Sequence, residues 1–122
     1  MAKKIIFVDD EPDVMRVTVF RLKKAGYEVI TGVNGQEAID LAKTQNPDLM
    51  LLDLRLPLML GSEVCRLMKS DDALKHIPVI LFTASVRDMA EKIKESGADD
   101  FLSKPFDHNK LLEKIGNFIG NK

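Results

Sequence analysis

Short apolar runs and amphipathic stretches alternate along the chain. Three runs are four residues long and apolar at every position, at residues 5–8, 49–52 and 79–82. A strand that helices cover on both faces has this pattern, which is typical of a parallel sheet. Residues 27–31 alternate like an edge strand, and residues 101–102 are predicted as a short fifth strand from their place in the order.

Amphipathic stretches between and after these strands predict five helices. The first covers residues 13–25 and is ended by Gly26. Side chains that favour the N-cap position precede the other four, namely Asn34, Ser62, Ser85 and Asp107. Ser62 would cap a helix over residues 63–69. The last helix carries the clearest apolar stripe, formed by Leu111, Leu112, Ile115, Phe118 and Ile119.

The strand–helix alternation predicts an α/β fold. Five repeats of this unit imply right-handed crossovers and a parallel sheet with helices on both faces. A chain of 122 residues has the length of one domain, and its 45% hydrophobic and 30% charged residues are those of an ordinary folded protein. We therefore expect residues 1–122 to form a single doubly wound, flavodoxin-like sheet with strand order 2-1-3-4-5.

Charge and cysteine content exclude several classes of protein. Eighteen basic and nineteen acidic residues give a net charge of −1, so direct nucleic-acid binding is not expected. No apolar stretch approaches the length of a membrane span, and the run at residues 5–8 is too short for a signal peptide. The single cysteine, Cys65, is expected to be a buried apolar side chain in a cytoplasmic protein.

Acidic side chains follow two of the predicted strands. Asp9 and Asp10 come after the first strand and Asp53 after the third, at the position where ligands bind such sheets. Two carboxylates about 4 Å apart repel by roughly 4 kcal/mol at an effective dielectric constant near 20. Lys104 and a hard cation, Mg²⁺ with Mn²⁺ tolerated, could offset this charge, and Thr83 adds a hydroxyl. These groups predict a phosphoryl-handling site with an aspartate nucleophile.

Four segments at predicted strand ends carry a family resemblance. They are VDDE at residues 8–11, DLRLPLMLG at 53–61, PVI with TA within 78–84, and GADDFLSKPF at 97–106. In this order they closely resemble the receiver domain of bacterial two-component response regulators, over essentially the whole chain. The type that fits is a stand-alone, chemotaxis-regulator-like receiver. A receiver excised from a longer DNA-binding regulator is the alternative.

A second alternative is a phosphatase of the haloacid-dehalogenase type, which also uses an aspartate at a strand end and Mg²⁺. That family has a second aspartate two residues after the nucleophile, where this sequence has Arg55. The chain also lacks room for the cap domain of that family. We therefore favour the receiver.

The resemblance implies roles for the site residues. Asp53 would accept a phosphoryl group from a phosphohistidine of a sensor histidine kinase or a histidine phosphotransfer protein. The chain would catalyse only its own phosphorylation and dephosphorylation. Asp10 and Asp53 would bind Mg²⁺ directly and Asp9 mostly through water, while the backbone carbonyl of Arg55 would supply a further oxygen.

The resemblance also implies a conformational switch. Lys104 and Thr83 would contact the phosphoryl group, and Phe101 would rotate toward the space that Thr83 vacates. The peptide bond before Pro105 would be cis. The surface of the fourth helix, fifth strand and fifth helix would then change its binding to a downstream protein that remains unidentified. We expect a monomer, with dimerisation after phosphorylation as an option.

Two further features fit more than one interpretation, and the two histidines carry an expectation of their own. Val14 and Val17 form a second apolar edge on the first helix, which fits either packing against the last helix or docking of a kinase helix bundle. The apolar residues 58–60 fit either packing or contact with a partner. His76 and His108 lack other metal ligands nearby and are expected to be solvated.

Overall fold

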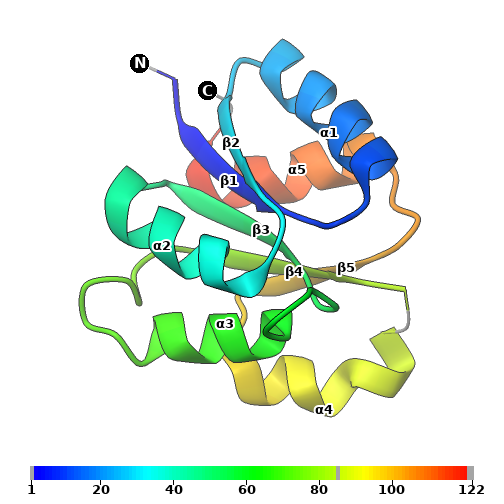
Figure 1. The fold of residues 1–122 in the computed structure, drawn as a ribbon. Coiled ribbons are helices and arrows are strands. Elements are labelled where there is room, and N and C mark those ends of the chain that lie inside the picture. Colours follow the sequence, from blue (N-terminus) through cyan, green and yellow to red (C-terminus); the bar gives the residue numbers. More distant parts are fainter. Residues whose placement is uncertain (1, 85, 121–122) are drawn as a thin grey trace.

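The computed structural model describes residues 2–84 and 86–120, and within these ranges five strands alternate with five helices (Figure 1). The strands are β1 (Lys4–Val8), β2 (Glu28–Gly32), β3 (Leu49–Asp53), β4 (Val79–Thr83) and β5 (Asp100–Ser103). The helices are α1 (Pro12–Lys24), α2 (Gly35–Gln45), α3 (Gly61–Lys69), α4 (Val86–Ser96) and α5 (His108–Ile119). No helix in the described ranges has the length and apolar content needed to cross a membrane.

The strands form one parallel sheet in the order β2-β1-β3-β4-β5. This order and the flavodoxin-like architecture confirm the fold predicted from the sequence. Val8 pairs with Leu52 in the register of β1 and β3. The carboxyl ends of these central strands therefore meet at one edge of the sheet, with Asp9 and Asp53 side by side.

Helices cover both faces of the sheet, as the fully apolar strands predict. Helices α1 and α5 lie on one side, and α2, α3 and α4 lie on the other (Figure 1). Within β1, Ile6 and Val8 join the core beneath α2 and α3, whereas Ile5 and Phe7 join the core beneath α1 and α5. All four side chains are fully buried. The alternation along each strand thus builds two cores from one sheet.

Two of the predicted N-caps are confirmed. Asn34 Oδ1 accepts a hydrogen bond from Glu37 N at 2.8 Å at the start of α2. Asp107 Oδ1 accepts one from Asn109 N at 2.8 Å at the start of α5. The predicted cap Ser85 lies outside the described residues.

The predicted cap at Ser62 is wrong. Helix α3 begins at Gly61, with Leu60 as its N-cap, and Ser62 is buried in the first turn. The cause is a tight return of the chain onto β3, because Gly61 N donates to Leu54 O at 2.7 Å. A Cβ at Gly61 would lie 2.2 Å from the carbonyl oxygen of Asp53, so only glycine fits there.

The apolar stripe of α5 is only partly buried. Leu111 and Ile115 are buried against the sheet, whereas Phe118 is 37% exposed near the end of the helix. Tyr27, just before β2, is buried, and its hydroxyl donates to Gly120 O at 2.8 Å. The C-terminal end of α5 is thereby joined to the amino-terminal edge of the sheet, opposite to the edge that carries the acidic residues.

Candidate functional site

Three carboxylates meet where β1 and β3 end. Asp9, Asp10 and Asp53 each offer one oxygen, and these oxygens lie within 4.8 Å of one another. Asp9 and Asp53 are buried, whereas Asp10 is exposed. The parallel register of β1 and β3 produces this cluster from segments that are distant in sequence. Oxygen atoms at this spacing suit a hard divalent cation.

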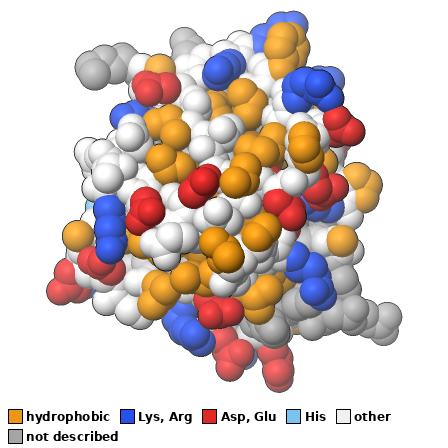
Figure 2. Space-filling model, viewed as in Figure 1, with side chains coloured by type: hydrophobic (Ala, Val, Ile, Leu, Met, Phe, Trp, Pro, Cys, Tyr) orange, Lys and Arg blue, Asp and Glu red, His pale blue; other side chains and the backbone are white. Residues whose placement is uncertain are grey.

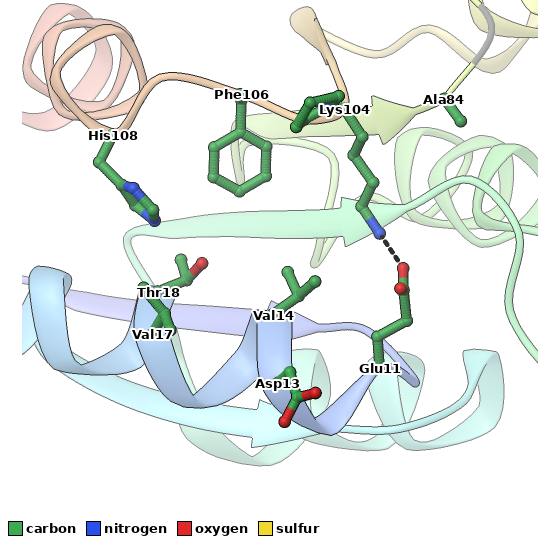
Figure 3. Close-up of a pocket in the computed structure, with 10 residues that line it drawn as sticks. Glu11, Asp13, Val14, Val17, Thr18, Ala84, Lys104, Phe106 and His108 are labelled. Carbon is green, nitrogen blue, oxygen red and sulfur yellow. Dashed lines mark hydrogen bonds and ion pairs between the residues drawn. The ribbon is translucent and has the colours of Figure 1, made fainter.

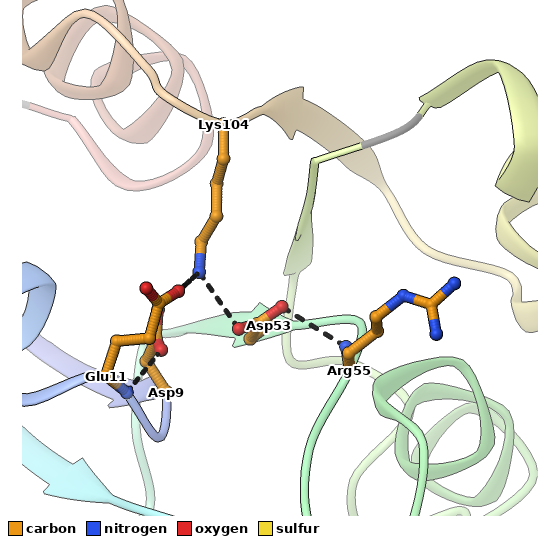
Figure 4. Close-up of polar contacts among 5 residues, drawn as sticks. All are labelled: Asp9, Glu11, Asp53, Arg55 and Lys104. Carbon is orange, nitrogen blue, oxygen red and sulfur yellow. Dashed lines mark hydrogen bonds and ion pairs between the residues drawn. The ribbon is translucent and has the colours of Figure 1, made fainter.

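Lys104 supplies the positive charge at this edge. It follows β5, and its Nζ lies 2.9 Å from Asp9 Oδ2, from Asp53 Oδ2 and from Glu11 Oε1 (Figure 4). An ammonium group has three N–H donors, so each carboxylate can receive one of them. The backbone is also fixed, because Lys104 N donates to Thr83 O at 2.8 Å. The peptide bond between Lys104 and Pro105 is cis.

Glu11 is the member of this group that the sequence analysis missed. It sits at the N-cap of α1, yet its side chain makes no capping hydrogen bond and turns to Lys104 instead. An acid directly after the pair Asp9–Asp10 was the available signal. That signal was weak, because an acid before a helix usually serves the helix itself.

Burial and ion pairing act in opposite directions on the two central groups. Burial raises the pKa of the Asp53 carboxyl, against the hydrogen bond and the charge of Lys104. Burial alone would lower the pKa of Lys104, but hydrogen bonds to Glu11, Asp9 and Asp53 outweigh it and raise that pKa. Lys104 therefore stays protonated at any physiological pH.

The second oxygen of Asp53 faces the loop that follows β3. Asp53 Oδ1 accepts a hydrogen bond from Arg55 N at 3.2 Å. The Arg55 side chain is exposed and points away from the carboxylates (Figure 4). This leaves the guanidinium on the solvent side of the site.

The apolar residues of this loop have different environments. Leu54 and Leu56 are buried, and Met59 packs against the core beneath α2 and α3. Leu58, in contrast, is 81% exposed and has a φ of 72°. Packing thus accounts for Met59 but not for Leu58.

Thr83 and Phe101 lie on the same flank of the sheet but in different surroundings. Thr83 is the last residue of β4 and is buried, whereas Phe101 on β5 is 42% exposed. The next residue, Leu102, points to the opposite face and is buried. The exposed aromatic ring therefore belongs to the outer surface of β5 and not to the core.

A groove of about 520 Å³ runs from this cluster along α1 (Figure 3). Val14, Val17 and Thr18 line one side, and Phe106 lines the other. Val14 is half-buried and Val17 is 47% exposed, so packing against α5 covers this edge only in part. Glu11 and Lys104 lie at the end of the groove that faces the carboxylates, which makes the groove continuous with the site.

His108 lies at the other end of the groove and is half-buried, so it is less solvated than predicted. Its ring stands edge-on to Phe106, with the centroids 5.5 Å apart, and its Nε2 is buried without a hydrogen-bond partner. Burial lowers the pKa of His108, and the charge of Arg21 lowers it further. The contact with Phe106 is one that the sequence pattern did not show. His76 is exposed, as predicted.

Cys65 has the environment expected from the sequence. It is a free, buried thiol on α3, in the core that faces α2. Burial raises the pKa of this thiol to about 11. The thiol is therefore protonated at neutral pH and acts as a small apolar side chain.

Comparison with known proteins places this geometry in a family. Residues 5–116 match the model of the response regulator receiver domain. The chain is 38% identical to the polar-differentiation response regulator DivK of Brucella anthropi, and the match covers 99% of both chains. The DivK protein of Brucella abortus is 36% identical over the same share of each chain.

Solved structures agree in fold. The receiver domain of sensor histidine kinase PA1611 from Pseudomonas aeruginosa has a TM-score of 0.92 and 29% identity, covering 98% of this chain and 99% of that one. That structure holds a magnesium ion coordinated in its active-site cleft. Chemotaxis response regulator CheY4 of Vibrio cholerae has a TM-score of 0.89 and 28% identity, covering 97% and 99%.

These matches agree with the resemblance seen in the sequence and leave no support for the haloacid-dehalogenase alternative. The fold, the strand order and the acidic cluster are those of one family. The chain belongs to the response regulator receiver domains, the phosphoacceptor signalling modules of two-component systems.

Proposed function

We propose that residues 1–122 act as one receiver in which Asp53 takes a phosphoryl group from a phosphohistidine of a sensor histidine kinase or a histidine phosphotransfer protein. The observation that carries this proposal is the position of Asp53. Its buried carboxylate shares a three-carboxylate cluster and faces the Lys104 ammonium at 2.9 Å. A nucleophile, a cation and a metal-ligating set are thus present within one site.

The transfer exchanges one bond to phosphorus for another. An oxygen of Asp53 attacks phosphorus, and the new O–P bond forms as the P–N bond to the partner's imidazole breaks. The departing ring nitrogen keeps the electron pair and takes a proton from solvent. Water later cleaves the acyl phosphate, so the chain catalyses only its own phosphorylation and dephosphorylation.

The donor set fits Mg²⁺, with Mn²⁺ tolerated. Asp10 and Asp53 would bind the ion directly, with the backbone carbonyl of Arg55, and Asp9 would bind it through water. Asp9 is buried, and its two oxygens accept from Glu11 N and Lys104 Nζ, both at 2.9 Å. Such an ion offsets charge on the transferred phosphoryl group.

Lys104 and Thr83 hold the phosphoryl oxygens after transfer. Phe101 then rotates toward the space that Thr83 leaves, and the surface of α4, β5 and α5 changes. Moving a two-state equilibrium from 1:99 to 99:1 takes about 5.5 kcal/mol of differential binding. Charge-assisted hydrogen bonds made only by the phosphorylated form are of the strength needed to supply that energy.

The phosphodonor docks through Val14 and Val17. These side chains line an apolar groove that ends at Glu11 and Lys104, so a helix lying in the groove can bring a histidine to Asp53. Exposed apolar area beside the reacting groups supports this assignment. The proposed occupant of the groove is one helix of a kinase helix bundle.

The output is a protein contact on the α4–β5–α5 surface, with an unidentified downstream target. The free chain is a monomer, and the phosphorylated form has the option of dimerising through the same surface. Acidic and basic side chains are interspersed on the face seen in Figure 2, which agrees with the absence of direct nucleic-acid binding. The single free thiol, Cys65, agrees with a reducing cytoplasm. Attachment to further domains of a longer regulator is compatible with the same mechanism.

Mass spectrometry of the intact protein tests the acceptor. After incubation with Mg²⁺ and acetyl phosphate, the wild-type protein gains about 80 Da as a labile adduct, as expected for one phosphoryl group. The Asp53→Asn variant gains none, whereas the control Asp13→Asn is labelled like the wild type because Asp13 is exposed and pairs with Arg16. Equal labelling of Asp53→Asn would overturn the assignment.

A further inference from the structure

The three carboxylates that hold Lys104 are not equivalent. Asp9 and Asp53 belong to the cluster whose oxygens lie within 4.8 Å of one another, together with Asp10. Glu11 stands outside this cluster, and its side chain is 58% exposed. Glu11 therefore binds Lys104 without belonging to the carboxylates that would hold a metal ion.

A divalent cation changes the balance among these partners. A cation held by Asp10 and Asp53, and by Asp9 through water, would draw on both carboxylates of the cluster that hold the ammonium, and it would also repel that ammonium. Two of the three attractions on Lys104 are weakened at once. The attraction of Glu11 is the one that remains, because this carboxylate lies outside the cluster.

The backbone of Glu11 is fixed for this task. Glu11 N donates to Asp9 Oδ1 at 2.9 Å, and Glu11 O accepts from Met15 N at 3.0 Å. Glutamate is not a favoured N-cap residue, and this side chain does not cap α1. A role in the helix thus does not explain the side chain, whereas the 2.9 Å contact with Lys104 does.

We propose that Glu11 is a positioning residue that keeps the Lys104 ammonium beside Asp53 when the acidic cluster holds a divalent cation. This inference rests on the proposed function of the site. It adds a residue outside the metal-ligating set, whose effect depends on the presence of the metal. Glu11 acts through Lys104 and takes no part in the bonds that form or break.

Lysine labelling with and without Mg²⁺ tests this role directly. The protein is treated with acetic anhydride, and the acetylation rate of Lys104 is compared with that of Lys69, which is mostly buried and paired with Asp99. Without Mg²⁺, Lys104 should be protected in the wild type and in Glu11→Ala, because Asp9 and Asp53 hold it. With saturating Mg²⁺, Lys104 should react roughly tenfold faster in Glu11→Ala than in the wild type, as expected for one lost charge-assisted hydrogen bond.

Two further variants test whether the charge of Glu11 itself is required. Glu11→Gln keeps an acceptor oxygen without the charge, so its Lys104 should react at an intermediate rate with Mg²⁺. Asp13→Asn removes a nearby charge that does not contact Lys104, and its labelling should match the wild type. Equal protection of Lys104 in Glu11→Ala and wild type at saturating Mg²⁺ would overturn the proposal. An equal rise with and without Mg²⁺ would also overturn it, because the role would not depend on the metal.

Phosphorylation provides a second measurement. At saturating Mg²⁺ and acetyl phosphate, Glu11→Ala should be phosphorylated several-fold more slowly than the wild type, and Glu11→Gln should lie between them. The two proposals fail in different ways. If Asp53 is not the acceptor, no variant forms the Asp53 adduct, while the labelling of Lys104 still reports the role of Glu11.

Discussion

Lys104 Nζ lies 2.9 Å from Asp53 Oδ2, although 51 positions separate the two residues in the sequence. The contact joins the end of β3 to the loop after β5, with β4 between them in the sheet. Because Lys104 also bonds Asp9 and Glu11, one ammonium is shared by three carboxylates. We therefore expect metal binding and phosphorylation at this site both to depend on how strongly Lys104 is held.

Removal of the Lys104 ammonium should strengthen Mg²⁺ binding and slow phosphorylation. In Lys104→Met, Mg²⁺ should bind more tightly, because a positive charge beside the cluster is lost. Phosphorylation by acetyl phosphate should slow by roughly a hundredfold, since one electrostatic contact to the phosphoryl group is gone. Isothermal titration calorimetry and the rate of the mass increase check the two effects. Weaker Mg²⁺ binding by Lys104→Met would contradict this account.

A negative charge in the groove should slow phosphoryl transfer from a protein donor but not from acetyl phosphate. Val14→Glu places a carboxylate on the apolar edge of α1, so transfer from a cognate phosphorylated protein should slow by at least about tenfold. Labelling by acetyl phosphate should stay unchanged. Leu67→Glu is a matched control, because Leu67 is 50% exposed on α3 and outside the groove. Unchanged transfer rates in Val14→Glu would remove the docking role.

His108 should make the stability of the protein depend on pH. Burial lowers the pKa of folded His108 below its ordinary value of 6.5, so the unfolded chain binds more protons just below pH 6.5. The free energy of unfolding should therefore fall as pH drops through this window. In His108→Phe this contribution should vanish, and stability at pH 7 should rise by about 1 kcal/mol because an unpaired buried nitrogen is removed.

Urea unfolding of wild type and His108→Phe between pH 5 and 8 measures this difference. His76→Phe is the control, because His76 is exposed and its change should leave the pH dependence as in the wild type. Identical pH slopes in His108→Phe and wild type would contradict the prediction.

Lys69 should contribute more to stability than a surface lysine. Its Nζ bonds Ile77 O and Asp99 Oδ2, both at 2.8 Å, and so joins α3 to the segments that precede β4 and β5. Lys69→Met should lower the free energy of unfolding by about 2 kcal/mol, since it leaves these acceptors without their charged donor. Lys75→Met, at an exposed pair with Asp72, should change it by less than about 0.5 kcal/mol. Urea titration distinguishes the two.

The backbone conformation of Leu58 should lower the free energy of unfolding. Its φ of 72° is unfavourable for a leucine, and its side chain is exposed, so packing does not offset the cost. Leu58→Gly should raise the free energy of unfolding by about 1 kcal/mol. Leu58→Ala, which keeps the Cβ and hence most of the cost, is the control for loss of the side chain. A destabilised Leu58→Gly would show that the exposed leucine makes a stabilising contact.

The fold followed from rules that depend on sequence alone. The fully apolar strands set a parallel sheet covered on both faces, and the strand order then placed Asp9 and Asp53 at one edge. Lys104 was within reach because β5 ends at the same edge. Periodicity and topology are global properties, so a single sequence carries enough information to predict them.

The wrong or missed predictions concern the directions of single side chains and the close contacts between segments. Ser62 is an acceptable cap in isolation, but with the return of the chain at Gly61 helix α3 starts two residues earlier than predicted. His108 was expected to be solvated because a single sequence does not show the contact of its ring with Phe106 or the burial of its Nε2. The contact of Glu11 with Lys104 depends on where one side chain points, which neither periodicity nor motif spacing determines.

The hydrogen bond from Tyr27 to Gly120 has a practical consequence. It fixes the last turn of α5 beside the start of β2, whereas Asp53 lies at the far end of the neighbouring strands. A fluorescent reporter fused beyond Gly120 would leave from the opposite pole of the molecule. Such a fusion should leave the approach of a phosphodonor to Asp53 unobstructed, which makes it a suitable probe of partner binding in living cells.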